Sequence, residues 1–133
     1  MQRRRVVVTG IGIVSPLGNT REETWAAAKE GRSGVGPITR FDASAFPTKF
    51  AAEIKGFSAD PFIEFKDQKK QDLFSQYAVA GSHEALSDAK LLEDTAGYER
   101  SKIGCVLGVG IGGLVMLEKY HQAYLEGGPK KIS

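Results

Sequence analysis

The segment with the clearest potential for ligand binding is a cluster of glycines that follows a short apolar stretch. The apolar stretch covers residues 103–107, and the glycines are Gly108, Gly110, Gly112 and Gly113. This pattern is typical of a buried strand that brings bare backbone close to a ligand. Only Val109 and Ile111 carry side chains within the cluster, and no Lys-Ser or Lys-Thr pair follows it. An apolar ligand wall therefore fits better than a phosphate site.

Three other side chains could in principle act as a nucleophile or as bases: Cys105, His83 and His121. Cys105 lies inside the apolar stretch, where a small, unreactive buried thiol is the commoner case. The two histidines fall on expected helices and lack partners at metal-ligand spacing, so we expect packing or interface roles for them. These residues by themselves indicate no catalytic site and no metal.

A second glycine turn, Gly10-Ile11-Gly12, follows the β-branched run at residues 6–8. A glycine pair after a strand is a weak sign of dinucleotide binding, but that motif needs a third glycine where Ser15 stands. Pro16 also delays the following helix. A nucleotide-binding α/β domain stays a weaker alternative.

Composition limits the partners that are expected. The net charge of +2 is too small to indicate nucleic acid binding by the whole chain. No apolar run approaches the ~18 residues of a membrane span, and the N-terminus lacks the pattern of a signal peptide. We therefore expect a cytoplasmic protein that binds neither nucleic acid nor membrane.

Periodicity predicts the elements that must position the glycine segments. Strands are expected at residues 6–8, 50–54 and 103–107, and helices at about 21–30, 60–65, 67–89 and 114–126. Thr20 and Glu23 form a capping box for the first helix, and Gly81 in the longest helix permits close approach of another backbone. Residues 33–37 are expected to form a loop, and residues 91–100 a polar connection. So few strands leave apolar faces uncovered, which predicts that the chain is part of a larger α/β domain.

Four segments, taken together, resemble the beta-ketoacyl-acyl carrier protein synthases, in particular the type II condensing enzyme of bacterial fatty acid synthesis. They are VVVTGIGIVSPLGN at 6–19, RFDASAFPTKFAAEI at 40–54, GVGIGG at 108–113 and EGGPKKIS at 126–133. The resemblance extends through all 133 residues in order. It implies a thiolase-like layered α-β-α fold, with residues 1–133 as most of the first half of an incomplete domain.

The resemblance also implies an activity for the complete chain, that of an acyltransferase needing no cofactor. A cysteine thiolate takes an acyl group from acyl carrier protein, and decarboxylated malonyl carrier protein then attacks the enzyme thioester. The nucleophile and two catalytic histidines of the family lie beyond Ser133, so no catalytic residue is expected in this segment. The implied partners are acyl carrier protein and a second copy in a homodimer. A stand-alone module that binds the carrier without chemistry stays open.

Candidate site residues follow from the same resemblance. Gly110, Ile111 and Gly112 are expected to bind substrate, with Ile111 at a bend of the acyl pocket where it limits chain length. Five lysines near the pocket mouth are expected to dock the acidic carrier: Lys66, Lys69, Lys70, Lys130 and Lys131. The first three are predicted to project from one side of the opening turns of the helix at 67–89.

Overall fold

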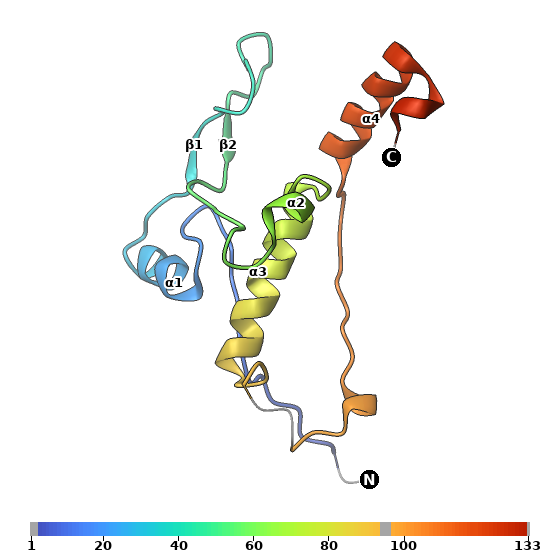
Figure 1. Ribbon diagram of the computed structural model, residues 1–133. Coiled ribbons are helices and arrows are strands. Elements are labelled where there is room, and N and C mark those ends of the chain that lie inside the picture. Colours follow the sequence, from blue (N-terminus) through green and yellow to red (C-terminus); the bar gives the residue numbers. More distant parts are fainter. Residues whose placement is uncertain (1–2, 94–96, 133) are drawn as a thin grey trace.

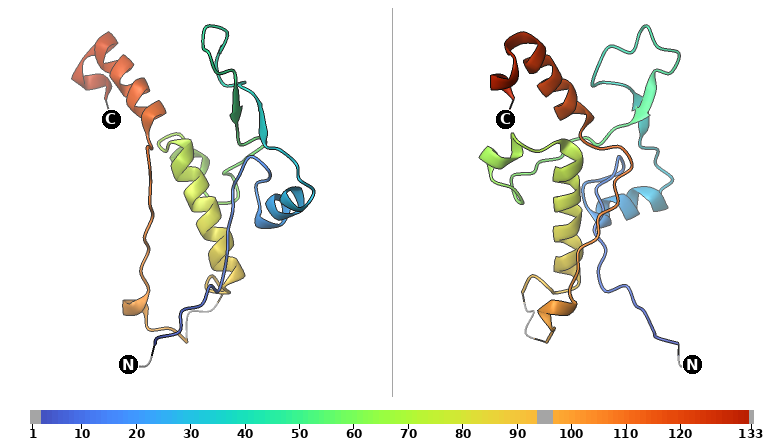
Figure 2. Two further views of the ribbon diagram at one scale, coloured as in Figure 1. Left: turned by 180° about the vertical axis from the view of Figure 1, so that it is seen from behind. Right: turned by 90° about the vertical axis from the view of Figure 1, so that its right-hand side faces the viewer.

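A computed structural model describes residues 3–93 and 97–132 (Figure 1). In chain order its elements are α1 (Arg21–Lys29), β1 (Val35–Pro37), β2 (Phe50–Ala52), α2 (Phe65–Gln68), α3 (Leu73–Asp88), the 3-10 turn η1 (Arg100–Lys102), α4 (Leu114–Gly127) and the 3-10 turn η2 (Pro129–Lys131). Helix α3 lies at the centre, α1 and the β1–β2 hairpin lie beside it, and α4 extends from the end where α3 begins (Figure 2). The predicted connection at 91–100 falls partly outside the described residues.

Helix α1 forms where the capping pattern predicts it. The Thr20 hydroxyl accepts a hydrogen bond from the Glu23 amide at 3.2 Å, and the Glu23 carboxylate accepts one from the Asn19 amide at 2.8 Å. These bonds satisfy amides that have no partner within a first helical turn. Gly31, with φ of +68°, ends the helix. The predicted helix is confirmed.

The long helix predicted at 67–89 is wrong at its start, because the chain forms two helices there. A short α2 ends at Gln68, and α3 begins at Leu73 after the extended residue Asp72. The buried Gln76 side chain joins the two, since its amide donates to the carbonyls of Gln68 and Gln71, both at 3.1 Å. The brief helix predicted at 60–65 is also misplaced, because residues 60–62 form only a turn before α2. Periodicity in the apolar residues does not reveal a break at polar residues.

The extended N-terminal segment packs directly on the backbone of α3. A β-carbon built on Gly12 would lie 1.9 Å from the Gly81 carbonyl oxygen, and one on Gly10 would lie 2.1 Å from the Ala85 carbonyl oxygen. Only glycine fits so close to a helix backbone. The close approach predicted at Gly81 is found, but it depends on Gly10 and Gly12, because a β-carbon on Gly81 itself would lie an ordinary 3.8 Å from the Gly12 carbonyl oxygen. The pair Gly10 and Gly12 therefore has a packing role that involves no nucleotide.

The sheet found among the described residues is a two-stranded antiparallel hairpin rather than a parallel sheet. Strands β1 and β2 pair with Val35 opposite Ala52 and Pro37 opposite Phe50. The strand predicted at 50–54 is confirmed over Phe50–Ala52, whereas the loop predicted at 33–37 is wrong because β1 occupies its second half. Glycine and proline disfavour strands, so the partner strand and not local propensity determines β1.

The two strands predicted at 6–8 and 103–107 are extended but unpaired within the described residues. Val6 is 90% exposed and Val106 is 96% exposed, and Cys105 is exposed as well, so the predicted burial of these residues is wrong here. Figure 1 shows residues 103–107 running lengthwise beside α3, whereas residues 6–8 extend past the end of that helix. A strand is buried only when neighbouring strands accept its hydrogen bonds and helices cover its faces. Neither condition is met within the segments that the structure describes.

Candidate functional site

The glycine segment forms one wall of an apolar groove against α3. The groove has a volume of about 550 Å³, and residues 107–111 face Phe74, Tyr77 and Ala78 across it. A β-carbon built on Gly108 or Gly110 would have no heavy atom of another residue within 4 Å. The backbone of these glycines is therefore open and forms part of the groove surface. A wall of this kind suits an apolar chain and offers no charged group for a phosphate.

The three predicted substrate-binding residues are close to one another but have different surroundings. Gly110 and Ile111 line the groove, and the Ile111 side chain is 83% exposed. Gly112 instead lies against α3, because a β-carbon there would be 2.8 Å from two ring atoms of Phe74. The structure thus brings Gly110 and Ile111 into one groove and gives Gly112 a packing role. Binding of substrate by these residues stays a prediction.

Asp72 is a residue whose role sequence reasoning missed. Its carboxylate accepts one hydrogen bond from the Leu73 amide at 2.8 Å and another from the Met116 amide at 3.2 Å. The first bond belongs to the start of α3 and the second to the start of α4. An aspartate directly before an apolar helical run is a recognisable N-cap signal. The contact with α4, 44 residues further along the chain, has no signal in the sequence.

Lys66, Lys69 and Lys70 are exposed. The sequence predicted them on the first turns of the long helix, but they lie on α2 and directly after it. Lys66 pairs with Glu64 at 2.9 Å, and Lys70 pairs with Asp67 at 3.0 Å. The Lys69 ammonium lies 4.3 Å from the centre of the Phe65 ring.

Lys130 and Lys131 lie on η2, which begins after Gly128 turns the chain with φ of +70°. The Lys131 side chain packs back on Gly127, at the end of α4. Figure 1 shows α2 beside the start of α3, whereas η2 lies at the far end of α4. Both lysine clusters are thus exposed, and docking of a carrier by them stays a prediction.

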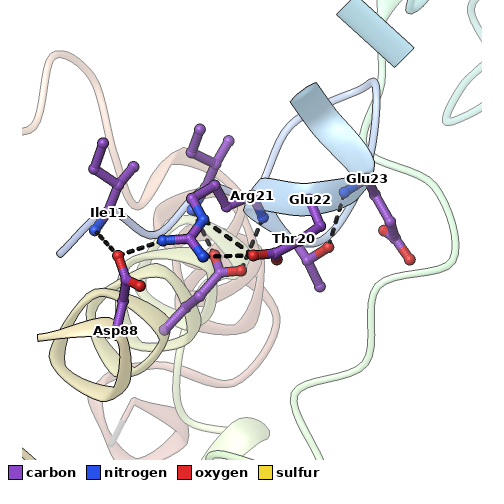
Figure 3. Close-up of polar contacts among 8 residues, drawn as sticks. Ile11, Thr20, Arg21, Glu22, Glu23 and Asp88 are labelled. Carbon is purple, nitrogen blue, oxygen red and sulfur yellow. Dashed lines mark hydrogen bonds and ion pairs between the residues drawn. The ribbon is translucent and has the colours of Figure 1, made fainter. Parts of the chain in front are cut away.

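Two carboxylates of α3 hold the N-terminal segment and α1 in place (Figure 3). Glu84 accepts hydrogen bonds from the amides of Ile13 at 2.7 Å and Arg21 at 2.8 Å. Asp88 accepts one from the Ile11 amide at 3.1 Å and forms an ion pair with the Arg21 guanidinium. Residues 84 and 88 are one helical turn apart, so both carboxylates face the same extended segment. We call Glu84 and Asp88 the carboxylate pair. They hold the N-terminal segment and the start of α1 on α3, and they do not line the groove.

The carboxylate pair predicts a pH dependence of stability. The Arg21 side chain, followed by the Ile11 amide, lowers the pKa of Asp88 below its ordinary value of 3.8. A carboxyl group with a lowered pKa stabilises the folded state fully above its ordinary pKa and loses that contribution as the pH falls through the folded value. Asp88→Asn should therefore lower the unfolding midpoint at neutral pH. The difference from wild type should shrink below about pH 4.

Denaturant unfolding of both proteins between pH 7 and pH 3 measures this effect. Glu118→Gln, at an exposed position of α4, serves as the control with the same change of charge. A difference between wild type and Asp88→Asn that is constant across the range would contradict the role of the charge.

The histidines have no catalytic surroundings among the described residues. The His83 ring packs on Phe62 with 5.1 Å between ring centres, and His121 is exposed on α4. Within residues 3–93 and 97–132 no group of three or more His, Cys, Asp or Glu side chains could hold a metal ion. No helix in those ranges is long and apolar enough to cross a membrane.

Comparison with known proteins identifies the family. Residues 3–133 match the family model described as beta-ketoacyl synthase, N-terminal domain. The chain belongs to this family. The beta-ketoacyl synthase resemblance seen in the sequence is confirmed, and the nucleotide-binding alternative loses its support.

Curated relatives agree with this assignment. The chain is 45% identical over 133 residues to 3-oxoacyl-[acyl-carrier-protein] synthase 2 of Vibrio cholerae. It is 43% identical over 133 residues to the protein of the same name from Synechocystis. In both comparisons all of this chain aligns, and it spans 32% of the relative's length.

A solved structure supports the fold. The ishigamide ketosynthase/chain length factor matches with a TM-score of 0.72 and 30% identity, over 99% of this chain and 32% of that one. Together with the family match, this similarity shows that the beta-ketoacyl synthase segment has the thiolase-like α/β fold expected from its sequence. The parallel core of that fold is not formed within the described residues.

Proposed function

We propose that this chain is most of the first half of a 3-oxoacyl-[acyl-carrier-protein] synthase, an acyltransferase of fatty acid chain elongation. The observation that carries the proposal is the 45% identity, over all 133 residues, to a relative of that name. The apolar groove agrees with it, because a growing acyl chain needs an apolar wall.

The proposed reaction has two stages. A thiolate of the complete enzyme attacks the acyl thioester of acyl carrier protein, which forms an enzyme thioester and releases the carrier thiol. Malonyl carrier protein then loses carbon dioxide, and its carbanion attacks the enzyme thioester, which forms a carbon–carbon bond and releases the thiolate. In this proposal the present residues bind and orient, and the reacting cysteine and histidines belong to the remainder of the full-length protein. No metal or cofactor takes part.

Within this proposal the groove binds the acyl chain. Gly110 leaves the backbone bare, so the chain can approach it closely, and the exposed Ile111 side chain limits its length. Gly112 contributes by holding this segment against Phe74 of α3. We further propose that the full-length enzyme acts in the cytoplasm as a homodimer. Supporting this, the apolar residues Leu114, Leu117 and Leu125 of α4 are 60%, 66% and 66% exposed. Sedimentation of the full-length protein tests the dimer.

The direct test is an assay of the full-length protein with acyl and malonyl carrier proteins. The expected result is a 3-oxoacyl carrier protein, two carbons longer, identified by mass, with release of carbon dioxide. Carrier binding without either product would favour the stand-alone binding module, and no binding and no product would refute the proposal.

A charge reversal tests the docking role of the lysines. The double variant Lys69→Glu with Lys70→Glu should lower kcat/KM for carrier-bound substrates several-fold at low salt. Rim contacts contribute only ~0.2 to 1 kcal/mol each, and they act mainly on the association rate. Because salt screens such attraction, the loss should shrink as ionic strength rises.

Small acyl thioesters without the carrier provide the comparison, and their kinetics should stay unchanged. The matched control is Lys29→Glu with Lys49→Glu, which reverses two exposed lysines outside both clusters. Equal losses with carrier-bound and small substrates would show that the lysines do not dock the carrier.

A further inference from the structure

We infer that Asp72 is a positioning residue that holds the start of α4, and with it the glycine segment, against the start of α3. The consequence for acyl chain selection rests on the proposed function. The positioning itself does not, because it follows from contacts within the described residues.

The start of α4 has no capping side chain of its own. Its N-cap is Gly113, a left-handed residue with φ of +78°, a conformation that glycine adopts without strain. Met116 is the third residue of α4, and its amide is one of the four that have no partner inside the helix. Asp72 supplies the missing acceptor from a different helix, at 3.2 Å. The cap that glycine cannot provide thus comes from α3.

One carboxylate serves two helix starts. One oxygen of Asp72 accepts from Leu73 at the start of α3, and the other accepts from Met116 of α4. Both helices direct the positive ends of their dipoles toward this group, which favours a negative charge there. An asparagine has a single side-chain acceptor oxygen and no charge, so it can cap one helix but not both.

Packing of Phe74, close to Asp72 in the sequence, also holds the glycine segment at the start of α3. The Phe74 ring lies against Gly112, where a β-carbon would be 2.8 Å from two of its ring atoms. Gly110 and Ile111 directly precede this contact and line the groove. Figures 1 and 2 show the first turn of α4 beside the start of α3, with the rest of α4 extending away. If the bond to Met116 is lost, the glycine segment keeps the Phe74 contact but loses its hydrogen-bonded link to the start of α3, and the width of the groove is less well defined.

The test compares Asp72→Asn with wild type in the full-length protein. Hydrogen exchange of a peptide covering residues 108–117 should be at least ten-fold faster in the variant, while the unfolding midpoint stays close to that of wild type. Asp42→Asn, the same change on the exposed loop between β1 and β2, should alter neither. Asp72→Ala should show the faster exchange together with a lower unfolding midpoint, because it loses both caps.

A second measurement addresses selectivity. With small acyl thioesters of increasing length, Asp72→Asn should raise KM for long chains several-fold and change kcat little, so the ratio of kcat/KM between long and short chains changes. A general loss of folded protein would reduce kcat equally for all lengths, which separates positioning from a structural defect.

The outcomes distinguish this inference from the proposed function. Unchanged exchange at residues 108–117 in Asp72→Asn would overturn the positioning role, whether or not the protein condenses acyl groups. Faster exchange with an unchanged length profile would overturn the effect on selectivity. A wild-type protein that forms no condensation product would refute the proposed function, and the exchange result would still decide the positioning.

Discussion

Replacing Gly12 with alanine should destabilise the protein by about 3 kcal/mol or more, or prevent it from folding. The new β-carbon would lie 1.9 Å from the Gly81 carbonyl oxygen and 2.8 Å from the Ala85 amide nitrogen. Both are backbone atoms of α3, so neither can move without disturbing helical hydrogen bonds. The N-terminal segment would have to leave α3, and its bonds to the carboxylate pair would be lost with it.

Denaturant unfolding of the full-length protein measures this effect, with Gly36→Ala as the matched control. A β-carbon at Gly36 meets only the Lys55 ammonium at 3.8 Å, at the end of a flexible side chain. The control should therefore change the free energy of unfolding by no more than about 0.5 kcal/mol. Similar midpoints for the two variants would show that the segment is not packed on α3 as described.

Ile111→Phe should prevent the full-length enzyme from using long acyl chains while sparing short ones. Ile111 lines the groove beside Gly110, and a larger ring there would fill space that a long chain needs. A pocket change of about this size is worth ~1 to 3 kcal/mol in discrimination between substrates, so kcat/KM for long chains should fall by about five-fold to more than one hundred-fold. Steady-state kinetics over a series of acyl chain lengths measures this.

Ile111→Val is the control, because it removes volume at the same position and should admit every length that wild type accepts. A phenylalanine variant that loses activity equally with all chain lengths would indicate a folding defect. Its unfolding midpoint would then be lowered as well, and Ile111 would not be a residue that limits chain length.

Elements with local signals could be predicted from the sequence. The capping pair of Thr20 and Glu23, with Gly31 after the helix, set the limits of α1, because all their hydrogen bonds join residues within one or two helical turns. The end of α4 at Gly128 follows from the same kind of local rule. The apolar character of the groove wall could also be predicted, since Val109 and Ile111 are the residues with side chains among the glycines at 108–113.

Features that depend on a distant partner could not be predicted in this way. Strand β1 exists because Val35 faces Ala52, although its own glycine and proline favour a loop. The extended runs at 6–8 and 103–107 have the propensity for strands but lack paired neighbours among the described residues. Strand propensity depends on a few neighbouring residues. Pairing and burial depend on which other segments of the folded chain lie alongside the strand.

The candidate site shows the same division. Sequence patterns and the family resemblance indicated Ile111 and the lysine clusters, because residue type and local spacing can be read directly from the sequence. The acceptor that Asp72 offers to Met116, 44 residues away, and the contact of Gly12 with Gly81 arise only when the chain brings separate helices and segments together. Hydrogen bonds and packing act over a few ångströms in space, and spacing along the chain does not encode those distances.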